Sequence, residues 1–257
     1  MTRPLALITG ASSGIGLDFV HLFAADGYDV AIVARSEAKL REIAADVEHR
    51  FGVSAEVIVA DLAQAHAARS VVDRIGRPID ALVNNAGYGL AGEFVRTDVS
   101  VELAMIQVNI AALTELTKLV LPQMVERRSG RIVNVASTAA FQPGPLMAVY
   151  YATKAYVLSF SEAIADELRN SGVTVTALCP GPTATNFAVE AGMTDKRLFT
   201  VSTPMASEKV ARIGYAAMKR GKRIEITGLR NKFMAQTVRF SPRRLVTTVV
   251  RRLQEKA

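Results

Sequence analysis

Short apolar runs and amphipathic helical patterns alternate along this chain with a period of about thirty residues. Such apolar runs are typical of strands buried in a parallel sheet, and the segments between them carry apolar residues at helical spacing. The alternation predicts an α/β fold: a doubly wound parallel sheet of about seven strands, with helices on both faces. We expect strands at 5–9, 29–34, 55–60, 79–84, 131–136, 173–179 and 223–227, and helices near 14–26, 37–50, 63–75, 100–127, 148–170 and 207–219.

Composition narrows the class of protein. The 257 residues are 50% apolar, enough for the core of one domain, and no run reaches the roughly eighteen apolar residues of a membrane span. The first strand starts within five residues of the N-terminus, which argues against a signal peptide. The single cysteine, Cys179, forms no internal disulfide, so we expect a cytoplasmic protein. With one cysteine and three scattered histidines, no metal site is predicted.

A glycine-rich turn follows the first expected strand directly and opens the first helix. Glycines here let backbone N–H groups approach a pyrophosphate, which then lies at the positive end of the helix. The alternative is a turn without a ligand, but its position between strand and helix disfavours that. The predicted cofactor contacts in this turn are Gly10, Ser12, Ser13, Gly14, Ile15 and Gly16.

Tyr150 precedes Lys154 by four residues on the helix expected at 148–170. Residues at this spacing share a helix face, so the phenol and the ammonium point into the same volume. A nearby cation favours the phenolate and lowers the pKa of the tyrosine toward the range useful for acid–base catalysis. The pair predicts a proton donor with its own activator, although the spacing alone is a weak signal.

These motifs, in this order, resemble the short-chain dehydrogenase/reductase family from Leu5 to about Thr227. The glycine turn is similar to that family's cofactor loop, and the resemblance implies a Rossmann-like fold. Three further cofactor contacts, Asn85, Ala86 and Gly87, resemble the family's second signature. A later segment with Pro180, Gly181, Thr183 and Thr185 resembles the family's loop that closes over the nicotinamide.

The resemblance also implies a catalytic tetrad of Asn109, Ser137, Tyr150 and Lys154. Tyr150 would give or take a proton on the substrate oxygen. Ser137 would donate a hydrogen bond to that oxygen. Lys154 would also bind the nicotinamide ribose, and Asn109 would hold a water that connects Lys154 to solvent. The implied reaction is hydride transfer between a nicotinamide and a carbonyl or alcohol.

The residues after the second expected strand bear on the choice of cofactor. An acidic residue at this position binds the ribose 2′-hydroxyl of NAD, but here the strand ends in Arg35. A guanidinium suits a 2′-phosphate, so NADP is predicted, the alternative being a plain surface charge. Asp61 and Leu62 resemble the family's adenine contact, although Asp61 equally fits the N-cap of the helix expected at 63–75.

The segment 182–204 is the expected flap over the substrate. Its apolar side chains, among them Phe187, Met193 and Leu198, and Met147 before the catalytic helix indicate an apolar or amphipathic carbonyl or alcohol substrate. Ordinary packing of a lid would need similar residues, so that alternative stays open.

The C-terminus carries the excess positive charge. From Lys219 onward there are twelve basic and two acidic residues, a net of +10, whereas the preceding residues have a net of −3. We therefore expect a dinucleotide-binding and catalytic domain over 1–228 and a basic amphipathic extension over 229–257. An apolar stripe with interleaved arginines either docks on the protein or a partner subunit, which we favour, or lies on an anionic membrane. Nucleic acid is not expected, because no recognition motif is present.

By resemblance, the helices at 100–127 and 148–170 would pair subunits, so a homodimer or homotetramer is expected. A second class of function is a non-catalytic nucleotide sensor or peripheral scaffold at a membrane surface. The tetrad favours the enzyme, because a sensor has no need of an activated phenol.

Overall fold

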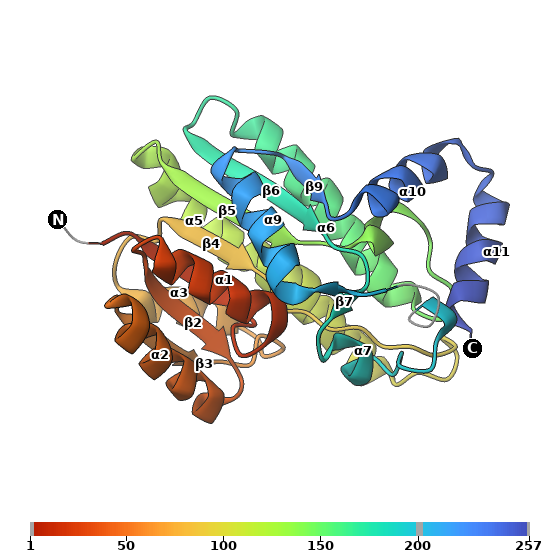
Figure 1. Ribbon diagram of the computed structural model, residues 1–257, viewed down its shortest axis with the longest axis horizontal. Coiled ribbons are helices and arrows are strands. Elements are labelled where there is room, and N and C mark those ends of the chain that lie inside the picture. Colours follow the sequence, from red (N-terminus) through yellow and green to blue (C-terminus); the bar gives the residue numbers. More distant parts are fainter. Residues whose placement is uncertain (1–2, 199–202, 256–257) are drawn as a thin grey trace.

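A computed structural model of the chain describes residues 3–198 and 203–255. Within them, a seven-stranded parallel sheet has the order β3-β2-β1-β4-β5-β6-β9 (Figure 1). The predicted doubly wound α/β fold is confirmed. The strands are β1 Leu5–Thr9, β2 Asp29–Ala34, β3 Ala55–Val59, β4 Ala81–Asn84, β5 Gly130–Val135, β6 Val173–Cys179 and β9 Ile224–Ile226.

The strands are buried on both sides because helices cover both faces of the sheet. Leu7 and Ile8 are neighbours on β1 and both fully buried, yet they pack into opposite halves of the core, as alternation along a strand requires. One face carries α1 Gly14–Ala25, α2 Glu37–Phe51 and α9 Ser207–Lys219; the other carries α3 Ala67–Ile75, α5 Leu113–Glu126 and α6 Ala148–Glu167.

Two expected helices differ from their predicted form. Helix α3 begins at Ala67, after His66 in the left-handed conformation, so Asp61 is not its N-cap; the Asp61 carboxylate instead accepts the N–H of Ala63 at 3.0 Å. The helix expected at 100–127 is divided into α4 Val99–Ile106, a π-helical segment η1 Gln107–Ala112, and α5.

By length and composition, the helical run Val99–Glu126 would suffice to cross a membrane, and 39% of its most apolar stretch is buried. Leu116, Val120 and Met124 on this run pack under the sheet with no more than 1% of their surface exposed. The α5 part of the run is therefore a helix that packs into the protein core.

Short elements lie beside the carboxyl edge of the sheet. They are the 3₁₀ turn η2 Thr138–Phe141, the strands β7 Thr183–Ala184 and β8 Met205–Ala206, and the helix α7 Phe187–Glu190. Strand β7 pairs with β8 and ties the two ends of the expected flap together. The flap residues 199–202 lie outside the described part of the chain.

The basic extension forms two helices, α10 Leu229–Phe240 and α11 Arg243–Gln254, at the edge of the molecule beyond β9 (Figure 1). Val246 and Val250 of α11 are buried against the flap region, and the N–H of Arg197 bonds to the carbonyl of Glu255 at 3.1 Å. Leu245 and Val249, on the other side of α11, remain exposed. One apolar row of the tail thus docks on the protein itself, as favoured from the sequence, and membrane contact stays an untested alternative.

Candidate active site

The glycine turn between β1 and α1 needs glycine for conformation and for space. Gly10 and Gly14 adopt positive φ values of 64° and 55°, which favour glycine. A Cβ on Gly16 would lie 2.2 Å from the carbonyl oxygen of Gly10. These residues bring the N-terminus of α1 against the loop, where Ser13 occupies the N-cap without a side-chain capping bond. The turn therefore presents backbone close to an approaching anion.

Thr9 and Asn85 join this turn to the loop after β4. The hydroxyl of Thr9 accepts the N–H groups of Asn85 and Ala86, each at 3.0 Å. The side-chain amide of Asn85 donates to the carbonyls of Thr9 at 3.0 Å and Gly10 at 3.2 Å. The two predicted cofactor loops are thus one hydrogen-bonded unit at the point where the strand order reverses, between β1 and β4.

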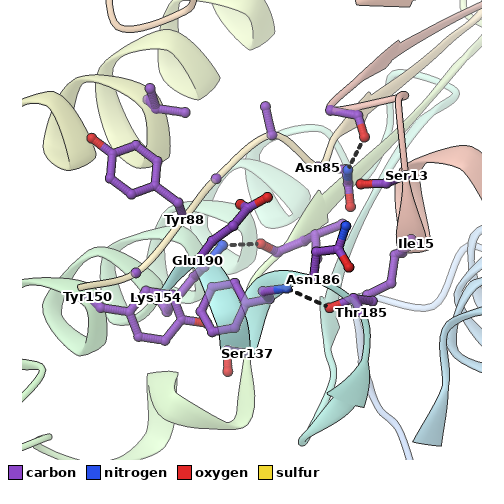
Figure 2. Close-up of a pocket in the computed structure, with 18 of the residues that line it drawn as sticks. Ser13, Ile15, Asn85, Tyr88, Ser137, Tyr150, Lys154, Thr185, Asn186 and Glu190 are labelled. Atoms are coloured by element: carbon purple, nitrogen blue, oxygen red, sulfur yellow. Dashed lines mark hydrogen bonds between the residues drawn. The ribbon is translucent and has the colours of Figure 1, made fainter. Parts of the chain in front are cut away.

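Ser137, Tyr150 and Lys154 converge beside this unit (Figure 2). Ser137 follows β5, and its hydroxyl accepts the N–H of Ala139 at 3.0 Å. Tyr150 and Lys154 lie on α6 and are 9% and 6% exposed. The Nζ atom of Lys154 donates to the carbonyl of Val135 at 2.8 Å and lies 5.9 Å from the centroid of the Tyr150 ring.

The electrostatics differ from the expected activation of the phenol by Lys154. Burial raises the pKa of Tyr150 above its ordinary value, and a hydrogen bond with Ser137 opposes that shift. Burial also lowers the pKa of Lys154 from 10.5 to about 8. Burial thus outweighs any lowering of the pKa of Tyr150 by Lys154, whose Nζ is held at the carbonyl of Val135, and the expected activation by Lys154 stays a prediction.

The shifted pKa of Lys154 should be measurable in the stability of the protein. Between about pH 8 and 10.5 the unfolded chain binds a proton that the folded protein lacks, so the free energy of unfolding rises with pH. Below this range the folded protein carries the full penalty, at most about 3 kcal/mol. Lys154→Met removes it, so urea unfolding should find this variant more stable than the wild type near pH 7. The difference should shrink by about pH 10; parallel pH profiles would contradict the assignment.

Asn109 lies in the π-helical segment and is 1% exposed. Its amide nitrogen donates to the carbonyl of Tyr88 and the hydroxyl of Thr153, each at 3.0 Å, and its oxygen accepts the N–H of Tyr88 at 3.2 Å. The side chain braces the loop after β4 against α6. A π-helical turn is often found at functional sites. Because both amide hydrogens are used, the proposed water would need another atom of this residue, and the proton relay stays a prediction.

A cavity of about 1260 Å³ opens at the carboxyl edge of the sheet. All but two of the predicted site residues line it. The exceptions are Gly16, which packs behind the loop, and Asn109, which lies behind the loop after β4. The lining includes Gly10, Ser12, Ser13, Gly14, Ile15, Arg35, Asp61, Leu62, Asn85, Ala86, Gly87, Ser137, Tyr150, Lys154, Pro180, Gly181, Thr183 and Thr185.

At one end of the cavity Arg35 is joined by Ser36 and Lys39, and the turn after β2 supplies no carboxylate to the lining. In the described chain Arg35 has no ion pair. The prediction missed Lys39 because a lysine in the first turn of a helix gives no sequence signal of its own. Two cations beside a hydroxyl form a suitable site for a phosphate.

The other end of the cavity is apolar and lies beside Tyr150. The ring of Phe187 is 5.2 Å from that of Tyr150, centroid to centroid, and Met147, Met193 and Leu198 complete the wall. The α11 residue Gln254 also lines this end and was not predicted, because its position in a basic tail gave no hint of a pocket. Among the described residues, no group of three or more His, Cys, Asp or Glu side chains could hold a metal ion.

Comparison with known proteins places this geometry in context. Residues 4–196 match the family model for short chain dehydrogenases. A very-long-chain 3-oxoacyl-CoA reductase from Anas platyrhynchos is 36% identical over 193 residues, which are 71% of this chain and 61% of that protein. The chain thus spans less than two thirds of that relative's length.

Two solved structures have a similar fold over most of the chain. A short-chain dehydrogenase from Sphingobium yanoikuyae, in complex with NADPH, is 34% identical with a TM-score of 0.83, covering 91% of this chain and 92% of the other. A bulky-bulky ketone specific alcohol dehydrogenase from Comamonas testosteroni is 29% identical with a TM-score of 0.79, covering 93% of each chain.

Proposed function

The chain belongs to the short-chain dehydrogenase family, and from this premise we propose that it is an NADP(H)-dependent oxidoreductase acting on a bulky, apolar or amphipathic carbonyl or alcohol. The observation that carries the proposal is the convergence of Ser137, Tyr150 and Lys154 beside the glycine turn in one cavity. An acid–base pair at a nucleotide-sized groove suits hydride transfer coupled to proton transfer.

The residues fit a nicotinamide dinucleotide. The cradle of Gly10, Gly14 and Gly16 leaves no room for side chains, and Arg35 and Lys39 suit a 2′-phosphate. The cofactor, when bound, would supply or accept the hydride. The NADPH complex of the Sphingobium relative supports this choice of cofactor.

The protein's own groups handle the proton and the substrate oxygen. In the reductive direction, the substrate carbonyl accepts hydrogen bonds from the hydroxyls of Ser137 and Tyr150. Tyr150 then gives its proton to the oxygen, which becomes an alcohol, and recovers a proton from solvent. The raised pKa of Tyr150 keeps the phenol protonated for this role. Lys154, at a pKa of about 8, is poised to exchange a proton near neutrality.

The substrate proposal rests on the apolar wall beside Tyr150, formed by Met147, Phe187, Met193 and Leu198. The relatives named as a very-long-chain 3-oxoacyl-CoA reductase and as a bulky-bulky ketone specific alcohol dehydrogenase support it. Members of this family are typically oligomeric, and we propose a homodimer or homotetramer here. Val99, Leu103 and Ile106 on the outer side of α4 are available for such a contact, since each is exposed.

The test is a titration of the purified protein with NADPH and NADH, followed by turnover of aliphatic and aromatic ketones of increasing bulk. We expect tighter binding of NADPH and turnover that rises with the apolar bulk of the ketone. Absence of binding of either nucleotide would overturn the cofactor site. Binding without turnover of any ketone would overturn the proposed substrate class.

A further inference from the structure

Gln254, in the last turn of α11, lines the apolar end of the cavity. Val246, Val250 and Gln254 are spaced four residues apart and form the buried face of this helix. The first two positions hold valine, as a buried stripe requires. The third holds glutamine, which is only 1% exposed.

Gln254 is half satisfied. Its Nε2 atom donates to the hydroxyl of Tyr151 at 2.7 Å, and its Oε1 atom is buried with no hydrogen-bond partner in the described structure. If the amide is rotated by half a turn, Oε1 faces Tyr151 instead, and Tyr151 then leaves Nε2 without a partner. Because buried polar atoms are normally paired, an unpaired one beside a cavity indicates a partner that arrives with a ligand.

Tyr151 supports the glutamine and is itself held firmly. Its ring packs on Gly144, where a Cβ would come within 2.1 Å of the ring. Burial raises the pKa of Tyr151 to about 12, so its hydroxyl stays protonated at neutral pH. A phenol that accepts a bond from Gln254 still has its own hydrogen to donate. The pair thus offers both a donor and an acceptor.

The pair lies close to the reacting end of the cavity. The ring centroids of Tyr150 and Tyr151 are 6.0 Å apart, and Gln254, Tyr151 and Tyr150 all line the same space. The surfaces between them are apolar, with Met147 and Met193 nearby. When the carbonyl of a substrate lies at Tyr150, a substrate group about one aromatic ring away from that carbonyl therefore lies at the Gln254–Tyr151 pair.

We propose that Gln254 and Tyr151 form a polar subsite for a hydroxyl group on an otherwise apolar carbonyl substrate. A hydroxyl both donates and accepts, so it can pair with either side of the amide and with the phenol. This proposal rests on the proposed function for its reacting carbonyl. It adds that the preferred substrate is a hydroxylated ketone, with the hydroxyl remote from the reacting carbon.

The test compares benzylacetone with its meta-hydroxy and para-hydroxy analogues, which place a hydroxyl on a rigid ring away from the carbonyl. Their dissociation constants are measured by calorimetry on the whole protein with NADP⁺ present, so that binding is read without turnover. We expect at least one hydroxylated ketone to bind the wild type about tenfold more tightly than benzylacetone. Gln254→Leu should abolish this preference, which is measured as the ratio of the dissociation constants of benzylacetone and the hydroxylated ketone.

A matched control is Gln236→Leu, the same change at an exposed position of α10, which should keep the preference. If Gln254→Leu is poorly folded, the double variant Tyr151→Phe/Gln254→Leu replaces both partners by apolar groups and leaves no orphan. It should likewise show no preference.

Equal binding of all three ketones to the wild type would overturn the subsite, as would a preference that survives in Gln254→Leu. These results are separate from failure of the proposed function. That failure would be an absence of turnover with NADPH, whatever the binding constants.

Discussion

Replacing Tyr150 by phenylalanine is expected to lower kcat by roughly 10²–10⁴-fold, because the variant keeps the ring and loses the proton. The ring is packed against Phe187 and buried, so Tyr150→Phe preserves the wall of the cavity. The affinity for NADPH should stay nearly unchanged, since the glycine turn and Arg35 are untouched. Steady-state kinetics with an accepted ketone, combined with a nucleotide titration, measures both.

The matched control is Tyr156→Phe on the same helix. Tyr156 is 37% exposed, and its hydroxyl bonds to that of Thr114 at 2.9 Å, away from the cavity lining. This variant should turn over the ketone at nearly the wild-type rate. If Tyr150→Phe also keeps the wild-type rate, another group supplies the proton and the mechanism proposed here fails.

Replacing Arg35 by aspartate is expected to reverse the choice of nucleotide, changing the NADPH-to-NADH affinity ratio by roughly 10²–10⁴-fold. Loss of a charged hydrogen bond to the 2′-phosphate accounts for about 10- to 150-fold of this. The new carboxylate repels that phosphate and accepts a bond from the 2′-hydroxyl of NADH, which accounts for the rest. Fluorescence titration with both nucleotides measures the ratio directly.

Arg41→Asp serves as the charge-matched control for this variant. Arg41 lies two residues further along α2 than Lys39, is paired with Glu37 at 2.6 Å, and does not line the cavity. Its replacement changes the net charge equally and should leave the nucleotide ratio within about twofold, since exposed pairs contribute little. An unchanged ratio in Arg35→Asp would mean that Lys39 or Ser36 alone reads the 2′-phosphate.

Much of the sheet could be predicted because its strands are buried on both faces and therefore appear as uninterrupted apolar runs. The strand Leu5–Thr9 is confirmed at both ends, and so is Asp29–Ala34. The start of α3 was harder to predict. The sequence pattern predicts a helix from residue 63, but the residues after Asp61 form a turn in which the Asp61 carboxylate accepts the N–H of Ala63. The helix begins only at Ala67, after His66 in the left-handed conformation.

The candidate site was predictable where chemistry is concentrated in short motifs, as with the glycine turn and the pair of Tyr150 and Lys154. What escaped prediction depends on contacts between distant segments. Asn109 is braced by Tyr88 and Thr153, which no local pattern connects to it. The pKa of Tyr150 was expected to fall, but the depth of burial that decides it exists only in the folded protein.

The residues that handle the proton and the C-terminal part of the substrate wall come from different segments of the chain. The chain leaves β9 at Gly228 and reaches the wall of the cavity only through α10 and α11, whereas the proton-handling residues lie on β5's following turn and on α6. A chimera joined at Gly228 would therefore take its proton-handling residues and most of the apolar wall from one parent, and from the other only the part of the wall that Gln254 supplies. Changes in the last two helices would therefore reshape one side of the substrate cavity without replacing Ser137, Tyr150 or Lys154.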